Sequence, residues 1–434
     1  MKLGWPEGGL WRHSDFLKLW SAQTISQVGS QVSGLALPLA AVLVLDASAF
    51  EVATLGAVEF LPFLLFALPA GVWVDRMRRK PILIVTDICR GLFLASIPLA
   101  YLLDALTMSQ LYVVGFLVGI GTVFFDVSYQ SYLPSLVRRD QLVEGNSLLE
   151  VTRNAAQIGG PGLAGVLVGV MTAPYAILLD AISFFGSAGL LGVIRNREAA
   201  PEREGEQSMR RELREGLDYL VRHRYWRPIS ITTASGNFFW TLSGSIVIVY
   251  AVRELDLSPA LIGLTFSLGS IGGLIGALLG KPFSGRFGVG PAIVASSVLF
   301  GPALVLVPLA PQSFPIPMLV ASFVIAGIGA VLYNITAISL MQTLTPERLL
   351  GRLNASRRFI VWGTIPLGSL VGGALASVIG LHATLWVGAI GASVSFLPVA
   401  LSPTRHIREM PEGQEPDPHV PLAAPGPAAA AADA

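Results

Sequence analysis

The sequence is poor in charge, cysteine and histidine. Only 13% of its 434 residues are charged, whereas soluble globular chains carry about 25%. A soluble protein with so little charge could not cover its surface with polar groups, so the composition excludes a large soluble domain and indicates an integral membrane protein. The single cysteine, Cys89, excludes an internal disulfide. The net charge of +1 gives no reason to expect a nucleic-acid partner.

Signatures of catalysis and of nucleotide or metal binding are also missing. The sequence has no Gly-x-x-x-x-Gly-Lys-Ser/Thr loop, no His-Glu-x-x-His and no paired Cys-x-x-Cys. All five histidines lie outside the cores of the apolar runs, so a histidine proton relay is not expected. We therefore predict that the protein is not an enzyme, that it has no cofactor or metal, and that any transport draws on an ion or solute gradient.

Long apolar runs dominate what is present. They are about twice the ~10 residues of a membrane barrel strand and do not alternate with polar residues, which favours helices of ~20 residues. The predicted spans are 16–45, 50–74, 81–103, 109–133, 146–171, 174–194, 228–252, 259–281, 290–310, 316–342, 354–379 and 382–402. The expected fold class is an all-α membrane protein with twelve transmembrane helices.

The twelve spans divide into two sets of six. The expected domains are an N-terminal bundle, a cytoplasmic linker with an amphipathic helix, a C-terminal bundle and a disordered cytoplasmic tail, at 1–194, 195–227, 228–402 and 403–434. An internal repeat supports two pseudo-symmetric bundles, because the stretch from Asn146 to Gly165 aligns with the stretch from Asn354 to Gly373.

Basic residues gather in the loops of one side. These loops contain Arg76 to Lys80, Arg195 to Arg227 and Arg348 to Arg358, whereas the opposite loops contain only Arg253. Such an asymmetry predicts that both termini are cytoplasmic, and an even number of spans also requires both termini on one side. The expected location is the cell (inner) membrane.

One loop between two spans carries a recognisable spacing. The segment Gly71-Val-Trp-Val-Asp75-Arg76-Met-Arg78-Arg79-Lys80-Pro81 resembles the loop signature of the major facilitator superfamily, although many members have glycine where this chain has Arg78. The stretches Ala176 to Phe185 and Arg214 to Arg224 resemble a subgroup with enterobactin exporters and macrolide efflux proteins. The run Gly159 to Gly165 resembles a fifth-helix motif of proton-coupled exporters, but the fourth span lacks the arginine of many drug/proton antiporters.

This resemblance implies a proton-coupled exporter of a small amphipathic organic molecule, a drug or a siderophore, that works by alternating access. An uncoupled facilitator and a transport-inactive sensor or scaffold on the same fold stay open as alternatives. The expected partners are the solute, protons and the lipid bilayer, and the expected assembly is a monomer. Asp75 is expected to act as a conformational latch. Arg76, Arg79 and Lys80 are further latch candidates, whose simpler role is to keep the loop in the cytoplasm.

Charged residues within the spans are candidates for function, because charge is costly in lipid. Glu59 and Asp126 have no partner on their own helices and are the candidates for proton coupling; the alternative for each is a permanently protonated, hydrogen-bonded core acid. Asp87 and Arg90 lie three residues apart on one helix face and are expected to neutralise each other.

Polar and aromatic residues at similar depth are candidates for contacts with the solute. They are Gln23, Gln27, Gln31, Tyr129, Asn237, Trp240, Tyr333 and Asn334. The three glutamines recur every fourth residue and so follow one stripe of a helix. The alternative for any one of them is an interhelical hydrogen bond worth about 0.6 kcal/mol. A packing hinge is expected at Gly159, Gly160, Pro161 and Gly165.

Overall fold

The structure, a computed structural model, describes residues 9–196, 198 and 209–409. Regular structure in these residues is helical throughout, which confirms the all-α fold class. A first group of helices comprises α1 (Ser14–Leu43), α2 (Ala49–Asp75), α3 (Arg79–Leu102), α4 (Met108–Leu136), α5 (Leu142–Met171) and α6 (Ala173–Gly192), with the short 3-10 helices η1 (Leu10–Arg12) and η2 (Arg139–Gln141).

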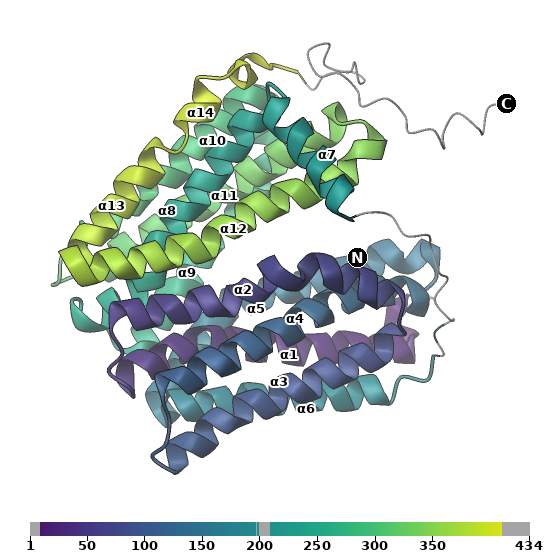
Figure 1. The fold of residues 1–434 in the computed structure, drawn as a ribbon, viewed down its shortest axis with the longest axis vertical. Helices are drawn as coiled ribbons and strands as arrows, with labels where there is room; N and C mark the ends of the chain where they lie inside the picture. The colour runs from purple at the N-terminus through teal and green to yellow at the C-terminus, as the bar shows by residue number, and fades with distance from the viewer. Residues whose placement is uncertain (1–8, 197, 199–208, 410–434) are drawn as a thin grey trace, which may run out of the picture.

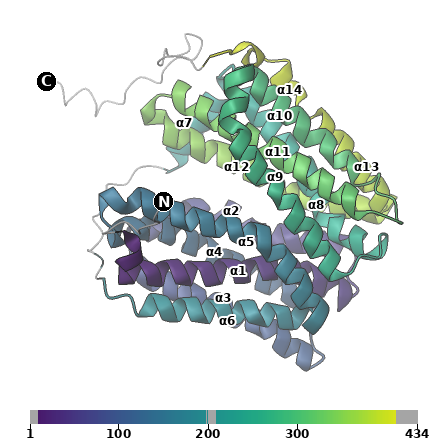
Figure 2. The ribbon, with the colours of Figure 1, turned by 180° about the vertical axis from the view of Figure 1, so that it is seen from behind.

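A second group follows α7 (Met209–Arg222) in the chain. It comprises α8 (Trp226–Arg253), α9 (Pro259–Phe287), α10 (Val289–Ala303), α11 (Ile316–Leu344), α12 (Glu347–Ile379), α13 (Leu381–Val394) and α14 (Leu397–Ala400), with η3 (Leu304–Leu306) and η4 (Pro403–His406). Figures 1 and 2 show the two groups lying against each other as separate bundles.

Eleven helices of the described residues are long and apolar enough to cross a membrane. The helix α5 is not among them, because its first half carries Glu144, Glu150 and Arg153 and its second half is rich in glycine. It nevertheless packs along α1 and α9 like the other long helices. The membrane-helix fold is thus confirmed, and the count of twelve spans stays a prediction.

Corresponding helices of the two groups begin in the same way. Ser48 caps α2 by accepting a hydrogen bond from Glu51 N (3.3 Å), and Glu51 Oε2 accepts one from Ser48 N (2.8 Å). Ser258 caps α9 through Leu261 N (3.4 Å). Each serine satisfies a backbone N–H that has no partner within the helix.

The two groups contact each other mainly at one end, which we call the closed end. There α2 packs on α12 and α5 packs on α9. Ser369 Oγ donates to Ala53 O (2.7 Å), and Arg253 Nη2 pairs with Asp46 Oδ1 (2.6 Å). Toward the opposite end, which we call the basic end, α2 and α12 diverge (Figure 1).

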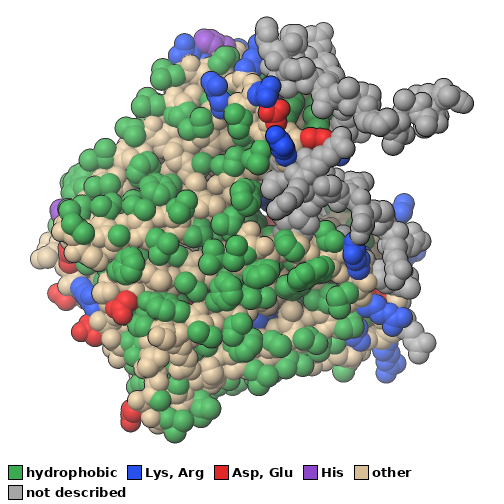
Figure 3. Space-filling model, viewed as in Figure 1, with side chains coloured by type: hydrophobic (Ala, Val, Ile, Leu, Met, Phe, Trp, Pro, Cys, Tyr) green, Lys and Arg blue, Asp and Glu red, His purple; other side chains and the backbone are tan. Residues whose placement is uncertain are grey.

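The basic end carries the residues of the signature-like loop, the start of α8 and the helix α7. Figure 3 shows apolar side chains over most of the drawn face, with most of its Lys and Arg side chains toward the right and the top. The helix α7 packs on α12 and α8, where Glu215 pairs with Arg352 and Leu220 is buried. In the described residues α7 therefore belongs with the second group.

The predicted tail, 403–434, starts too early. Ser402 Oγ accepts a hydrogen bond from Thr404 N (3.2 Å) and so begins η4. Gly290 N then donates to Ile407 O (2.7 Å), which fixes the chain against the start of α10. The rest of the predicted tail, 410–434, lies outside the described residues.

Candidate functional site

Arg79 and Lys80 of the signature-like loop bind the chain that follows α6. Lys80 Nζ donates to Gly192 O (3.1 Å) and Ile194 O (2.6 Å). The Glu198 carboxylate accepts hydrogen bonds from the backbone N–H groups of Arg79 (2.7 Å) and Lys80 (3.3 Å) at the start of α3, and it pairs with Arg79 Nη1 (3.0 Å). A cation thus lies at one helix C-terminus and an anion at a helix N-terminus, the favourable arrangement for both helix dipoles.

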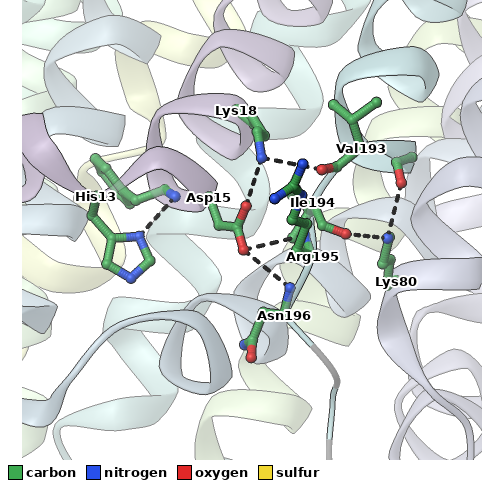
Figure 4. A network of polar contacts seen from close by, with 10 residues as sticks. His13, Asp15, Lys18, Lys80, Val193, Ile194, Arg195 and Asn196 are labelled. Carbon is green, nitrogen blue, oxygen red and sulfur yellow. Dashed lines mark hydrogen bonds and ion pairs between the residues drawn. The ribbon is translucent and has the colours of Figure 1, made fainter.

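The same segment is bound by the first turn of α1 (Figure 4). Asp15 Oδ2 accepts from the backbone N–H groups of Arg195 (3.2 Å) and Asn196 (3.0 Å), and Lys18 Nζ donates to Val193 O (3.1 Å). These contacts join α1, α3 and α6 at the basic end.

The contacts of Arg79 and Lys80 in this conformation therefore lie within the first group and give both residues a role beyond topology. Arg76 is exposed, and the side chain of Asp75 lies outside the described part of the chain. The latch formed by Asp75, Arg76, Arg79 and Lys80 stays a prediction.

Replacing Glu198 by alanine should destabilise the first group. The carboxylate is 4% exposed, and hydrogen bonds to charged groups contribute about 1.5–3 kcal/mol, so we expect a loss of that size. Thermal unfolding of the purified protein in detergent measures it. The control is Arg138→Ala, because the Arg138–Asp140 pair is mostly exposed and such pairs contribute about 0–1 kcal/mol. Equal effects of the two substitutions would refute the capping role.

Glu59 lies on α2 and faces α4. A Cβ atom added at Gly115 would lie 2.9 Å from Glu59 Cγ, and one added at Gly119 would lie 2.7 Å from Glu59 O. Gly115 therefore creates the space in which the Glu59 side chain lies, and Gly119 lets the backbones of α2 and α4 approach each other. Its Oε1 atom is buried and has no hydrogen-bond partner among the described residues. An unpaired buried carboxyl oxygen is rare in proteins and calls for a functional or solvent explanation.

Asp126 lies on α4 and interacts electrostatically with Arg90 of α3 and Arg153 of α5. Both cations belong to other helices, so spacing along one helix does not reveal them. Tyr129, one turn further along α4, stacks on Phe125 at 6.1 Å between ring centroids. The Tyr129 hydroxyl is buried without a hydrogen-bond partner in the described part of the chain.

Three of the predicted solute contacts come together in the second group. Asn237 of α8 and Tyr333 and Asn334 of α11 line one pocket with an empty volume of about 400 Å³. The Tyr333 hydroxyl donates to Ile229 O (3.0 Å) and lies 2.9 Å from Thr233 Oγ1. Trp240, one turn from Asn237, contacts Phe300 of the pocket wall at 5.2 Å between centroids. Ligand pockets typically combine apolar walls with a few polar groups, as this one does.

The candidates of the first group do not line that pocket. Gln31 packs its Cβ against Gly160 of α5, and Gln23 has a buried Oε1 atom with no partner among the described residues. Gln27 is half-buried on the same helix. Of the predicted stripe, Gln31 therefore lies at the contact between α1 and α5, where packing against Gly160 explains its position.

A second cavity lies between the groups, beyond their contact toward the basic end. It has an empty volume of about 900 Å³ and is lined by Phe63, Leu64 and Ala67 of α2 and by Asn354, Arg358 and Trp362 of α12, among others. Phe60 and Phe63 stack at 5.2 Å, and Trp362 contacts both rings edge-on at 6.0 and 6.1 Å. Arg358 lies over the Trp362 ring, 5.4 Å from its centroid.

Sequence reasoning missed this aromatic cluster, because its members come from distant parts of the chain. The spacing of Phe60 and Phe63, three residues apart, was the only local sign. The cavity places an aromatic and cationic surface where the two groups separate.

The predicted hinge on α5 is a contact surface at two of its three glycines. A Cβ atom at Gly160 would collide with Gln31, and one at Gly165 would lie 3.0 Å from Gly263 Cα in α9, while the carbonyl oxygen of Pro161 lies close to Gly263. Gly159 is exposed and has open space around it. Gly159 therefore makes no close helix contact in this conformation, because it lies on the face of α5 turned away from its neighbours. Movement about these residues stays a prediction.

Arg253→Ala should have a small effect on the closed end. Arg253 Nη2 also donates to Ala47 O (3.0 Å), but Asp46 is 95% exposed, and exposed pairs contribute about 0.2–1 kcal/mol. We expect the population of the closed arrangement to change less than about tenfold. Distances between spin labels on the two groups at this end measure it, and complete opening would show that this pair dominates the contact.

Known proteins resemble the chain over most of its length. Residues 10–425 match the family described as transmembrane secretion effector. The multidrug efflux pump Tap of Mycolicibacterium fortuitum is 26% identical over 352 residues, 78% of this chain and 84% of that protein. Macrolide efflux protein A of Streptococcus pyogenes is 23% identical over 371 residues, 85% of this chain and 90% of that protein.

Solved structures share the fold at low sequence identity. The nucleoside transporter NupG has a TM-score of 0.73 and 12% identity, over 90% of this chain and 98% of that chain. A likeness at this identity establishes the fold alone. The family match covers nearly all of the described helices. The chain therefore belongs to the major facilitator superfamily, in the family of transmembrane secretion effectors.

Proposed function

We propose that this protein exports a small amphipathic organic molecule across the cell membrane by alternating access, in exchange for protons. The observation that carries this proposal is the arrangement of the two groups. They contact each other at the closed end and leave an aromatic, cationic cavity between α2 and α12 toward the basic end. A solute in that cavity would have access from one side only.

The orientation follows from charge. Lys and Arg residues of the loops gather at the basic end, and positively charged loops stay in the cytoplasm. The cavity of this conformation would then open inward, as required for an exporter that collects its solute from the cytoplasm or the inner leaflet. Both termini would be cytoplasmic.

The solute class rests on the relatives and on the cavity walls. The two relatives are named as pumps for multiple drugs and for macrolides. Phe60, Phe63 and Trp362 offer flat apolar surface, whereas Asn237, Tyr333 and Asn334 offer hydrogen-bonding groups in the pocket of the second group. Such a combination suits a drug that has both an apolar body and several polar substituents. A siderophore would also satisfy this description.

The proton role is assigned to Glu59 or Asp126. Transport against a gradient needs a group that binds the coupling ion on one side and releases it on the other, and carboxyl groups within the membrane are typical carriers. The Glu59 side chain packs against a glycine and has one carboxyl oxygen without a hydrogen-bond partner among the described residues. Asp126 interacts electrostatically with two cations on neighbouring helices, Arg90 and Arg153. Rocking of the two groups about the cavity would alternate the access of these carboxyls.

Flux in proteoliposomes tests the proposal. The purified protein is reconstituted, and movement of a macrolide is followed with and without an imposed pH gradient. We expect the macrolide to accumulate on the acidic side only when the gradient is present. Equal flux in both conditions would identify an uncoupled facilitator, and no flux of any tested drug or siderophore would favour the sensor or scaffold alternative.

A further inference from the structure

A buried polar cluster in the first group has no role in the function proposed above beyond the interaction of Arg90 with Asp126. It surrounds Arg90, whose side chain is 3% exposed. Arg90 lies about 16 Å from the start of α3 at 1.5 Å per residue. Arg90 pairs with Asp87, which is 0% exposed. The Arg90 guanidinium also lies between two rings, 4.4 Å from the centroid of Phe125 and 4.2 Å from that of Phe184. Two cation–π contacts and one ion pair hold this side chain in place.

A second carboxyl group enters the cluster from α6. Asp180 is 1% exposed and accepts a hydrogen bond from Ser183 Oγ (3.0 Å). It interacts with Ser33 of α1, and electrostatically with both Arg90 and Asp87. The absence of a side chain at Gly29 of α1 makes room for Asp180 and Ser183. The hydrogen-bonding partner of Asp180 is therefore the neutral hydroxyl group of Ser183.

Charge does not balance in this cluster. Arg90 can neutralise one carboxylate, and its direct partner is Asp87. Asp126 of α4 also interacts with Arg90, and Arg153, the other cation near Asp126, is 58% exposed and pairs with Glu150 at 3.6 Å. Glu59 faces a different part of α4, at Gly115 and Gly119, whereas Arg90 packs on Gly121. The buried carboxylates thus outnumber the buried cation, and excess charge in a dry interior must be neutralised.

Unpaired atoms at the centre of the cluster also point to a missing partner. Asp87 Oδ2 and Arg90 Nε are buried and have no hydrogen-bond partner within the described residues. The Ser187 hydroxyl of α6 lies near Asp87 and is likewise buried, but it has no hydrogen-bond partner among the described residues. A proton on one carboxyl group would supply the positive charge that the cluster lacks.

We propose that the Asp87–Arg90–Asp180 cluster is a second proton-binding site, in which Asp180 carries the proton and Arg90 keeps Asp87 ionised. The site rests on the proposed proton-coupled function only for its use in transport, since proton binding can be measured without a solute. Transfer of the proton from Asp180 to Asp87 would let the Arg90 guanidinium pass from Asp87 to Asp180, so that one carboxyl group stays protonated and the other stays ionised and paired. This exchange would couple α3 to α6.

Infrared spectroscopy of the full chain in lipid nanodiscs tests the site directly. A protonated carboxyl group gives a C=O stretching band that an ionised one lacks. We expect the wild-type protein at neutral pH to show such a band from Asp180, and Asp180→Asn to lose it. Arg90→Gln should add a band, because Asp87 loses its cation, whereas Arg90→Lys should leave the spectrum unchanged. Ser183→Ala should shift the same band by removing its hydrogen bond, which serves if Asp180→Asn does not fold.

The outcomes separate this site from the carriers of the proposed function. A wild-type spectrum identical to that of Asp180→Asn overturns the proton at Asp180. A band that sodium chloride removes at constant pH, with potassium chloride as the control, overturns it in favour of a sodium site. A band lost in Glu59→Gln but kept in Asp180→Asn overturns the cluster while supporting the proposed function. The reverse result supports the cluster and leaves the role of Glu59 to the flux measurements.

Discussion

Adding one methyl group at Gly165 is expected to open the closed end of the molecule. The Cβ atom of Gly165→Ala would lie 3.0 Å from Gly263 Cα and closer still to the Pro259 carbonyl oxygen. Those atoms are backbone, so no side-chain rotation can relieve the collision, and α5 must move away from α9. Overpacking of this kind costs about 1–3 kcal/mol, which changes the ratio of two conformations by roughly 5- to 150-fold.

The helix α5 itself supplies a matched control. Gly169 lies one turn beyond Gly165 and has open space where its Cβ would be, so Gly169→Ala makes the same chemical change without the collision. Spin labels on Leu103 and Ser313, which are exposed in loops of the two groups at this end, report the separation in a Cys89→Ser background. We expect a longer distance in Gly165→Ala alone. Unchanged distances in both variants would show that the glycine contact does not hold this end closed.

Glu59→Gln is expected to abolish uphill export and to spare downhill flux. Glutamine has nearly the size and shape of a protonated glutamate, so the packing against Gly115 should survive. It cannot release a proton, however, so solute movement no longer draws on the gradient, and we expect accumulation to fall by more than about tenfold. Asp126→Asn, measured beside it, shows which carboxyl carries the proton.

Accumulation and downhill flux of a macrolide in proteoliposomes give both quantities from one preparation. Gln342→Glu, an added carboxyl at an exposed position of α11, controls for a general effect of changing charge. Loss of both fluxes in Glu59→Gln would indicate a structural acid. Full accumulation in both carboxyl variants would leave the coupling proposal without a carrier among these two residues.

The long helices and the division into two groups could be predicted from the sequence, because apolar runs and basic loops are local signals. The predicted starts of the second and eighth spans agree with caps at Ser48 and Ser258, whose partners lie three residues away. The helix α5 was predicted from its apolar second half, although Glu144, Glu150 and Arg153 weaken the signal over its first half.

The candidate site could be predicted only in part, because its contacts join distant segments. The sequence makes Arg79 and Lys80 candidates for a latch or for topology signals, and it does not indicate their partners in the structure, Glu198 and the carbonyl groups that end α6. Asp87 and Arg90 pair as their spacing predicted. That spacing says nothing about Asp180, which enters the same cluster from another helix. The proposed proton coupling and solute contacts depend on such convergence, and a single sequence does not encode it locally.

The most direct test of the account is proton movement driven by the solute itself. Proteoliposomes contain a pH-sensitive dye, no pH gradient is imposed, and a macrolide gradient is applied across the membrane. We predict that protons move opposite to the macrolide in the wild-type protein and stay still in Glu59→Gln. Macrolide flux without any proton movement in the wild-type protein would contradict the claim that a carboxyl group within the first helix group couples transport to protons.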